Sequence, residues 1–239
     1  MVCRNIFIVP WLYLKLCWYA SHTNSIPVEK KMALLKTIVG YANRGGNVEI
    51  KAYGVENIPS EGSFMFFPNH QGLYDVLAMI ETSPIFFSVV VKKELMKIGF
   101  LRTVFKIMGA YAIDREDVRQ AMKTITSVTK EVVSGRNYLI FPEGTRSKNG
   151  NNVGSFKGGS FKAATQAKCP IIPVALVDSF KPFDTNSTRP VTVQVHFLKP
   201  MLYEDYKDMK TVEIAAAVEQ QIQETINKNL TKEKVEEKC

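Results

Sequence analysis

Two kinds of hydrophobic pattern alternate along this chain. Short runs that are wholly apolar, or that alternate apolar and polar residues, are typical of strands. They occur at residues 48–53, 64–67, 84–91, 109–115, 137–141, 170–177 and 191–197. Apolar residues three or four positions apart, typical of helices, occur at residues 29–42, 75–80, 95–108, 117–134, 161–167 and from 211 onward. Strands that alternate with helices predict an α/β fold, with a mixed, largely parallel sheet flanked by helices.

Residues 43–47, Asn-Arg-Gly-Gly-Asn, interrupt these patterns and are interpreted as a linker. We therefore expect two regions, an N-terminal helical segment at 1–45 and one domain at 46–239. A domain of that length can bury a sizeable hydrophobic core.

The most apolar and aromatic segment is 6–20. Lys15 interrupts it, and it is shorter than the roughly 20 residues that span a bilayer. Trp11 and Trp18 belong to a residue type enriched at the membrane–water boundary. We interpret the segment as a helix lying in this boundary, paired with the helix at 29–42, so that this region serves membrane association. The alternatives are a helix packed on the core of the domain, or a signal peptide.

The composition adds a formal net charge of +8 at pH 7. A basic excess suits an anionic partner, such as a phosphate group, a nucleic acid or an acidic membrane surface. The lysines and arginines are dispersed, with no recognised nucleic-acid-binding module around them, so we expect no nucleic-acid partner. The cysteines are far apart, which predicts reduced thiols and neither a metal site nor a disulfide framework. They are Cys3, Cys17, Cys169 and Cys239.

A predicted strand ends at Pro68, and the motif Asn-His-Gln-Gly-Leu-Tyr-Asp follows at residues 69–75. On a continuous helix, His70 and Asp75 would lie about 140° apart. Gly72 permits a turn between them, so we expect His70 on a loop, Asp75 at a helix start, and a hydrogen bond between the two. A carboxylate on one imidazole nitrogen leaves the other free to accept a proton. The alternative is that His70 caps a turn and Asp75 caps a helix.

A second polar motif, Phe-Pro-Glu-Gly-Thr-Arg-Ser, occupies residues 141–147 at the end of another predicted strand. Arg146 presents a planar fork that suits a phosphate, and the amides of Gly144 and Thr145 can share the phosphate's charge. Glu143 would repel a phosphate, so we expect it to orient Arg146 or the turn. By itself the motif could be a salt-bridged turn. Both motifs follow strand ends, where open sheets bind their ligands.

The order of these motifs resembles the glycerolipid acyltransferase family, and within it the bacterial 1-acyl-sn-glycerol-3-phosphate acyltransferases. The likeness covers roughly residues 48–200, and the His-x4-Asp motif is similar to the family's catalytic block. Many members carry Ser where this chain has Gly72, which puts an extra hydroxyl in the site in doubt. The family's other blocks correspond to residues 92–95 with 113–115, 141–147 and 171–174.

The resemblance implies transfer of a fatty acyl group from a thioester to the sn-2 hydroxyl of 1-acyl-glycerol 3-phosphate, giving phosphatidic acid in phospholipid biosynthesis. His70 would accept the hydroxyl proton and Asp75 would steady the imidazolium. The acceptor oxygen would attack the thioester directly, with no covalent acyl-enzyme, metal or cofactor. Acyl-CoA or acyl carrier protein would be the donor. The alternatives are an acyltransferase for glycerol 3-phosphate or another lysophospholipid, and a non-catalytic membrane lipid-binding module.

For the acceptor phosphate the resemblance favours Arg146, followed by Lys92 or Lys93. Lys92 is preferred because it holds the leading position of the family pattern Lys-x-Glu-Leu. Two roles are open for Arg115, either at the phosphate site or paired with Asp114 and Asp117, and we favour the pairing. The full predicted substrate-binding set is Arg146, Lys92, Lys93, Glu143, Gly144 and Thr145.

A long acyl chain needs an apolar trough near His70. The helix predicted at 95–108 would form one wall, since it places Leu95, Ile98, Leu101, Phe105 and Met108 on one face. Both lipid substrates reside in a bilayer, so we expect a peripheral or monotopic protein on the cytoplasmic face of the cell membrane, held at an anionic surface.

Overall fold

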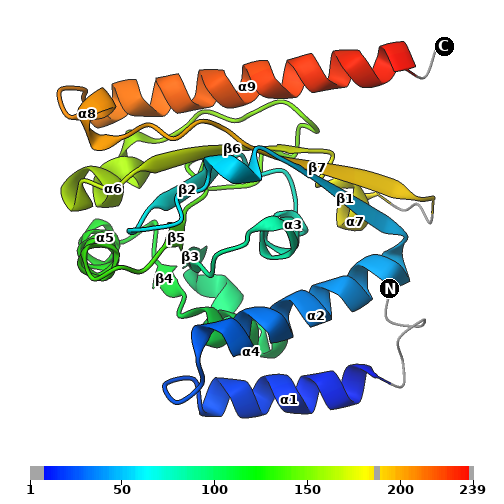
Figure 1. Ribbon diagram of the computed structural model, residues 1–239. Coiled ribbons are helices and arrows are strands. Elements are labelled where there is room, and N and C mark those ends of the chain that lie inside the picture. Colours follow the sequence, from blue (N-terminus) through cyan, green and yellow to red (C-terminus); the bar gives the residue numbers. More distant parts are fainter. Residues whose placement is uncertain (1–7, 186–188, 237–239) are drawn as a thin grey trace.

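The computed structural model describes residues 8–185 and 189–236, and it confirms the predicted α/β architecture (Figure 1). Within these residues one sheet holds seven strands in the order β1-β7-β6-β2-β5-β3-β4. Five neighbouring strands run parallel, whereas β7 is antiparallel to β6, and β1 runs parallel to β7. The strands are β1 (Val48–Tyr53), β2 (Met65–Pro68), β3 (Ser88–Lys92), β4 (Tyr111–Ile113), β5 (Tyr138–Leu139), β6 (Ile171–Val177) and β7 (Val191–Phe197).

Helices cover both faces of the sheet, with α1 to α4 on one side and α5, α6 and α9 on the other (Figure 1). The α-helices are α1 (Val9–Ser21), α2 (Val28–Gly46), α3 (Asp75–Thr82), α4 (Gly99–Met108), α5 (Val118–Val133), α6 (Lys162–Ala167), α7 (Lys181–Asp184), α8 (Tyr203–Tyr206) and α9 (Thr211–Glu236). Three 3₁₀ turns join them in the described part of the chain: η2 (Val55–Asn57), η3 (Lys93–Lys97) and η4 (Gly158–Phe161).

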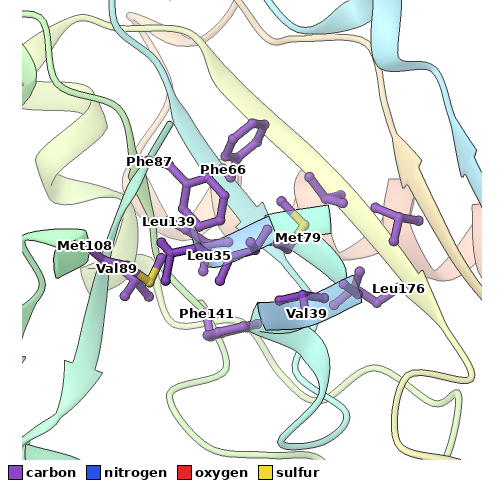
Figure 2. Packing of buried hydrophobic residues seen from close by; sticks show 14 of the residues in the cluster. Leu35, Val39, Phe66, Met79, Phe87, Val89, Met108, Leu139, Phe141 and Leu176 are labelled. Carbon is purple, nitrogen blue, oxygen red and sulfur yellow. The ribbon is translucent and has the colours of Figure 1, made fainter. Parts of the chain in front are cut away.

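The central strand β2 supplies both hydrophobic cores, because successive side chains of a strand point to opposite faces. Phe66 packs with α2 and α3, whereas Met65 and Phe67 pack with α5, α6 and α9. Figure 2 shows the first core, in which Leu35 and Val39 of α2 face the sheet side chains. Strand β2 is therefore anchored on both faces directly before the motif at 69–75.

The linker predicted at 43–47 is wrong, because α2 continues to Gly46 and Asn47 ends it with a left-handed conformation (φ 52°). Two glycines weaken a helix by about 1 kcal/mol each relative to alanine. Tertiary packing offsets this here: Asn43 is buried and accepts a hydrogen bond from the Tyr74 hydroxyl.

Several other elements are shorter than predicted, among them β4 and β5. Strand β3 begins at Ser88, not at residue 84, because its neighbour β5 offers no pairing partner before Tyr138. The helix predicted at 95–108 is split into η3 and α4 at Ile98, whose extended backbone (ψ 111°) directs the side chain outward. Gly99 follows at once and lowers the cost of that break.

The region predicted at 1–45 contains α1 and nearly all of α2. Residues 1–7, which include Cys3, and the residue Cys239 lie outside the described residues. Helix α1 packs against α2 and α4 through Leu12, Leu16 and Ala20. Its opposite side leaves Trp11, Leu14 and Trp18 exposed. Within the described ranges, every helix is too short or too polar to span a membrane.

Candidate active site

The His70–Asp75 pair has the predicted geometry. Strand β2 ends at Pro68, His70 lies on the following loop, and Asp75 is the first residue of α3. The Asp75 Oδ2 atom lies 2.7 Å from Nδ1 of His70, and it also accepts the Gln71 amide hydrogen at 2.7 Å. The Gly72 amide donates to the same carboxylate at 3.1 Å. This carboxylate can hold Nδ1 protonated, which leaves Nε2 as the proton acceptor.

The second motif holds the histidine loop in place. The Phe141 ring stacks on the His70 imidazole with centroids 4.0 Å apart. Glu143 Oε1 accepts the His70 amide hydrogen at 2.9 Å, and the Ser147 amide donates to the His70 carbonyl at 2.8 Å. Of the two predicted roles of Glu143, contact with Arg146 is not found, because Arg146 lies beside Asp184, whereas the carboxylate does tie the turn at 141–147 to the histidine loop. Its partner is His70, because β2 and β5 are adjacent strands and their following loops meet.

Burial raises the pKa of Glu143, and the hydrogen bond from the His70 amide opposes this only in part. The folded protein therefore binds this proton more tightly than the unfolded chain does. It loses stability as pH rises from the pKa of an unfolded glutamate through that of Glu143 in the folded state. Glu143→Gln removes this loss, so the melting temperature of the variant relative to the wild type is expected to increase as the pH rises above the pKa of an unfolded glutamate.

The control for this measurement is Glu61→Gln, which removes one charge from an exposed carboxylate. Subtracting its profile corrects for the change in net charge. If the difference in melting temperature between Glu143→Gln and the wild type stayed constant with pH, the Glu143 carboxyl would titrate alike in the folded and unfolded states.

A cavity of about 410 Å³ adjoins His70. Its walls are mainly apolar and come from α2, α3, β3, η3 and α4, which agrees with the predicted apolar trough. Leu101 and Phe105 of α4 form one wall, as expected for the helix at 95–108. Four cations also line it, and no acidic side chain of the described residues does; the cations are Lys92, Arg115, Arg146 and Lys148. The site therefore combines a base, an apolar trough and an anion-attracting rim.

The predicted phosphate ligands are only partly brought together. Arg146 and Thr145 line the cavity with Lys92, whereas Lys93 is bound to Asp114 outside it. The preference for Lys92 over Lys93 agrees with this arrangement. Nζ of Lys92 lies 3.6 Å from Oε2 of Glu94, and a guanidinium nitrogen of Arg146 lies 3.5 Å from Oδ1 of Asp184. Both are long ion pairs between partly exposed groups. Gly144 forms the tight turn, with φ at 75°.

Arg115 does not take the role that we expected from its neighbours. Lys93 occupies Asp114, and the Asp117 carboxylate caps α5 by accepting the amide hydrogens of Arg119 and Gln120. Arg115 instead lines the cavity beside His70. Lys148 also lines it, and no motif in the sequence indicated that residue.

A further site residue, Ser179, follows β6 and was not predicted. Its fully buried hydroxyl donates to Asp75 Oδ1 at 2.5 Å, and its amide donates to Gln71 Oε1 at 2.9 Å. Gly72 allows this approach, since a Cβ there would lie 2.9 Å from the Phe180 Cα atom. A serine at position 72 would not fit unless the backbone near Phe180 moved. In this chain the hydroxyl that donates to Asp75 belongs to Ser179. Ser179 and Asp75 lie 104 positions apart in the sequence, so no local pattern predicts their contact.

Known proteins resemble this chain in sequence and in fold. A 1-acyl-sn-glycerol-3-phosphate acyltransferase of Borreliella burgdorferi is 33% identical over 159 residues, which are 65% of this chain and 63% of the relative. The protein of the same name from Salmonella typhimurium is 32% identical over 156 residues, with the same two shares. The chain thus matches somewhat less than two thirds of the length of these relatives.

The crystal structure of the 1-acyl-sn-glycerophosphate (LPA) acyltransferase PlsC from Thermotoga maritima superposes with a TM-score of 0.72 at 21% identity. The superposition covers 95% of this chain and 96% of that one, and it establishes the shared fold. The Acyltransferase family model matches residues 49–177, more than half of the chain, and spans both polar motifs. The chain therefore belongs to the Acyltransferase family.

Proposed function

We propose that the protein transfers a fatty acyl group from an acyl thioester to the sn-2 hydroxyl of 1-acyl-glycerol 3-phosphate, giving phosphatidic acid. One observation carries the proposal: the His70–Asp75 pair adjoins a cavity with apolar walls and a cationic rim. The walls suit acyl chains, and the rim suits a phosphate. The family and the names of the relatives support the same reaction.

In this mechanism the acceptor hydroxyl gives its proton to Nε2 of His70 as its oxygen attacks the thioester carbon. The carbon–sulfur bond then breaks, and the leaving thiolate takes the proton back from the imidazolium. Asp75 stabilises the imidazolium through Nδ1, and the amides of Gln71 and Gly72 keep the carboxylate fixed. The positive charge on the imidazolium therefore forms beside a carboxylate.

The acceptor phosphate would bind at the cationic rim, with Arg146 as the main ligand and Lys92 and Lys148 beside it. A dianionic phosphate can displace the weak contact between Arg146 and Asp184. The carboxylate of Glu143 would not repel this phosphate strongly, because it is buried against the His70 amide.

The direct test is release of free thiol by purified protein from acyl-CoA and from acyl carrier protein, with detergent or vesicles and a panel of acceptors. We expect release with 1-acyl-glycerol 3-phosphate and little with monoacylglycerol, which lacks the phosphate. Faster reaction with glycerol 3-phosphate or with a lysophospholipid of larger headgroup would replace the proposed acceptor. No release with any acceptor would indicate a non-catalytic lipid-binding protein.

We also propose that the exposed side of α1 holds the protein on the cytoplasmic face of the cell membrane. Leu14 and Trp18 are 68% and 56% exposed. Phe100 of α4 stacks with Tyr13 of α1 and also lines the cavity, so the trough adjoins this surface. Leu14→Ser with Trp18→Ser should lower the amount of protein that floats with anionic vesicles, while Val212→Ser on the opposite helix layer should not. Equal flotation of both variants would contradict this placement.

Ser179→Ala is expected to lower kcat by roughly tenfold, the effect of about 1.4 kcal/mol lost from a hydrogen bond to a carboxylate. The KM for either substrate should hardly change, because Ser179 acts through Asp75 and is fully buried. Steady-state kinetics provide the measurement. Ser88→Ala is a matched control, since it removes a buried hydroxyl that donates to the Met108 carbonyl at 2.7 Å, away from the site. Ser179→Thr should restore kcat, and a rise in KM without a fall in kcat would contradict the positioning role.

A further inference from the structure

A second cavity, of about 280 Å³, adjoins the first. Val90, Arg115 and Phe141 line both, so the two cavities share a wall. The Phe141 ring in that wall stacks on the His70 imidazole. The turn of the second motif is divided between them, with Gly144 at the second cavity and Thr145 at the first. The second cavity therefore begins at the wall that packs on His70.

The second cavity is also positively charged. Arg115, Lys157 and Lys162 line it, and no acidic residue of the described chain does. None of these three cations forms an ion pair within residues 8–185 and 189–236. The Lys157 ammonium lies directly over Gly144, since a Cβ there would be 3.4 Å from its Nζ atom. Uncompensated cations at a hollow favour an anionic ligand.

Apart from Ser160 and two glycines, the rest of the lining is apolar. Val118 and Met122 of α5 are exposed at this cavity, at 73% and 43%, and Ile113 lies beside them. A ligand that combines a flexible, partly apolar arm with a terminal phosphate fits such a surface. The acyl donor of the proposed reaction has this chemistry, since coenzyme A and acyl carrier protein both carry the thioester on a phosphopantetheine arm.

The two substrates must also occupy different places. The apolar trough and the rim of Arg146, Lys92 and Lys148 suit the acyl chains and the acceptor phosphate. The donor arm has to leave the thioester in another direction. Resting on the proposed function, we propose that the second cavity binds the phosphopantetheine arm of the acyl donor, with its phosphate at Lys157 and Lys162.

The experiment compares three donors that carry the same acyl group. Acyl-CoA and acyl carrier protein have the phosphorylated arm, while an S-acyl-N-acetylcysteamine keeps only its thioester end. For Lys157→Ala with Lys162→Ala, we expect the KM of both phosphorylated donors to rise about 3- to 10-fold, because charged contacts at a partly exposed site are modest. The KM of the truncated donor and of 1-acyl-glycerol 3-phosphate should stay unchanged. Lys123→Ala with Lys130→Ala, on exposed positions of α5, removes the same charge and is the control.

The possible failures are distinguishable. If the wild-type protein releases no thiol from any donor, the proposed function itself fails. If it is active but the double variant raises the KM of the truncated donor equally, or raises that of the acceptor instead, the assignment of the second cavity is overturned. If both donors are used by the wild type, an effect on acyl-CoA alone also overturns it, because the arm phosphate is common to both donors. If Lys123→Ala with Lys130→Ala raised the KM of the phosphorylated donors by a similar factor, the cause would be the loss of net charge and not the second cavity.

Discussion

His70→Ala is expected to lower kcat for thiol release by about 10²–10⁴, the usual contribution of a general base. The KM values should change little, because the trough and the cationic rim do not depend on the imidazole. An alcohol is a poor nucleophile near neutral pH, so removing the proton acceptor at Nε2 should leave only the binding contribution to the rate. Steady-state kinetics with the preferred acceptor provide the measurement.

The fold should tolerate this change. Asp75 would keep its hydrogen bonds from Gln71, Gly72 and Ser179 when the imidazole is removed. Circular dichroism and the melting temperature verify this, and His22→Ala, at the end of α1, serves as the control. A folded His70→Ala protein with an unchanged rate of thiol release would exclude the general-base role of His70 and favour the hypothesis of a non-catalytic lipid-binding module.

Asp75→Asn is expected to lower kcat by about 10²-fold or more, although the side chain keeps its shape. The carboxylate accepts from His70 on one oxygen and from Ser179 on the other. An amide offers one acceptor and one donor, so one of these two partners must face an N–H group. The neutral amide also no longer stabilises the imidazolium that forms as the hydroxyl attacks.

The decisive comparison is between this variant and a double variant. If Asp75 acts only through the imidazole, Asp75→Asn should add little to the loss already caused by His70→Ala. If the losses in kcat of the two single variants multiplied in the double variant, His70 and Asp75 would act separately. Asp117→Asn is the isosteric control, because an asparagine caps α5 as well as the aspartate does.

The geometry of the His70–Asp75 pair could be predicted from the sequence because it is local. Pro68 ends β2, Gly72 permits the turn, and the carboxylate five residues after His70 reaches back to it. The fold class was predictable for a similar reason, since strand and helix periods are properties of short segments. The apolar trough also followed from a single helix pattern, even though Ile98 of that pattern points outward.

The partners of the site residues could not be predicted in the same way. Glu143 binds the His70 amide, Arg115 lines the cavity, and Ser179 holds Asp75. Each contact joins segments that are neighbours only because of the strand order, in which β2 lies between β6 and β5, and β4 lies beside β3. The extension of α2 into the predicted linker has the same origin, in the contact between Asn43 and Tyr74.

The sequence by itself determined the alternation of strands and helices, the histidine–aspartate pair and the residue types of a phosphate site, since these depend on spacings of a few residues. Only the tertiary structure decided which loops meet at His70, which cations remain unpaired there, and that a second basic cavity adjoins the first. The physical reason is that sheet order brings together residues 70 to 110 positions apart, and hydrophobic periodicity does not specify that order.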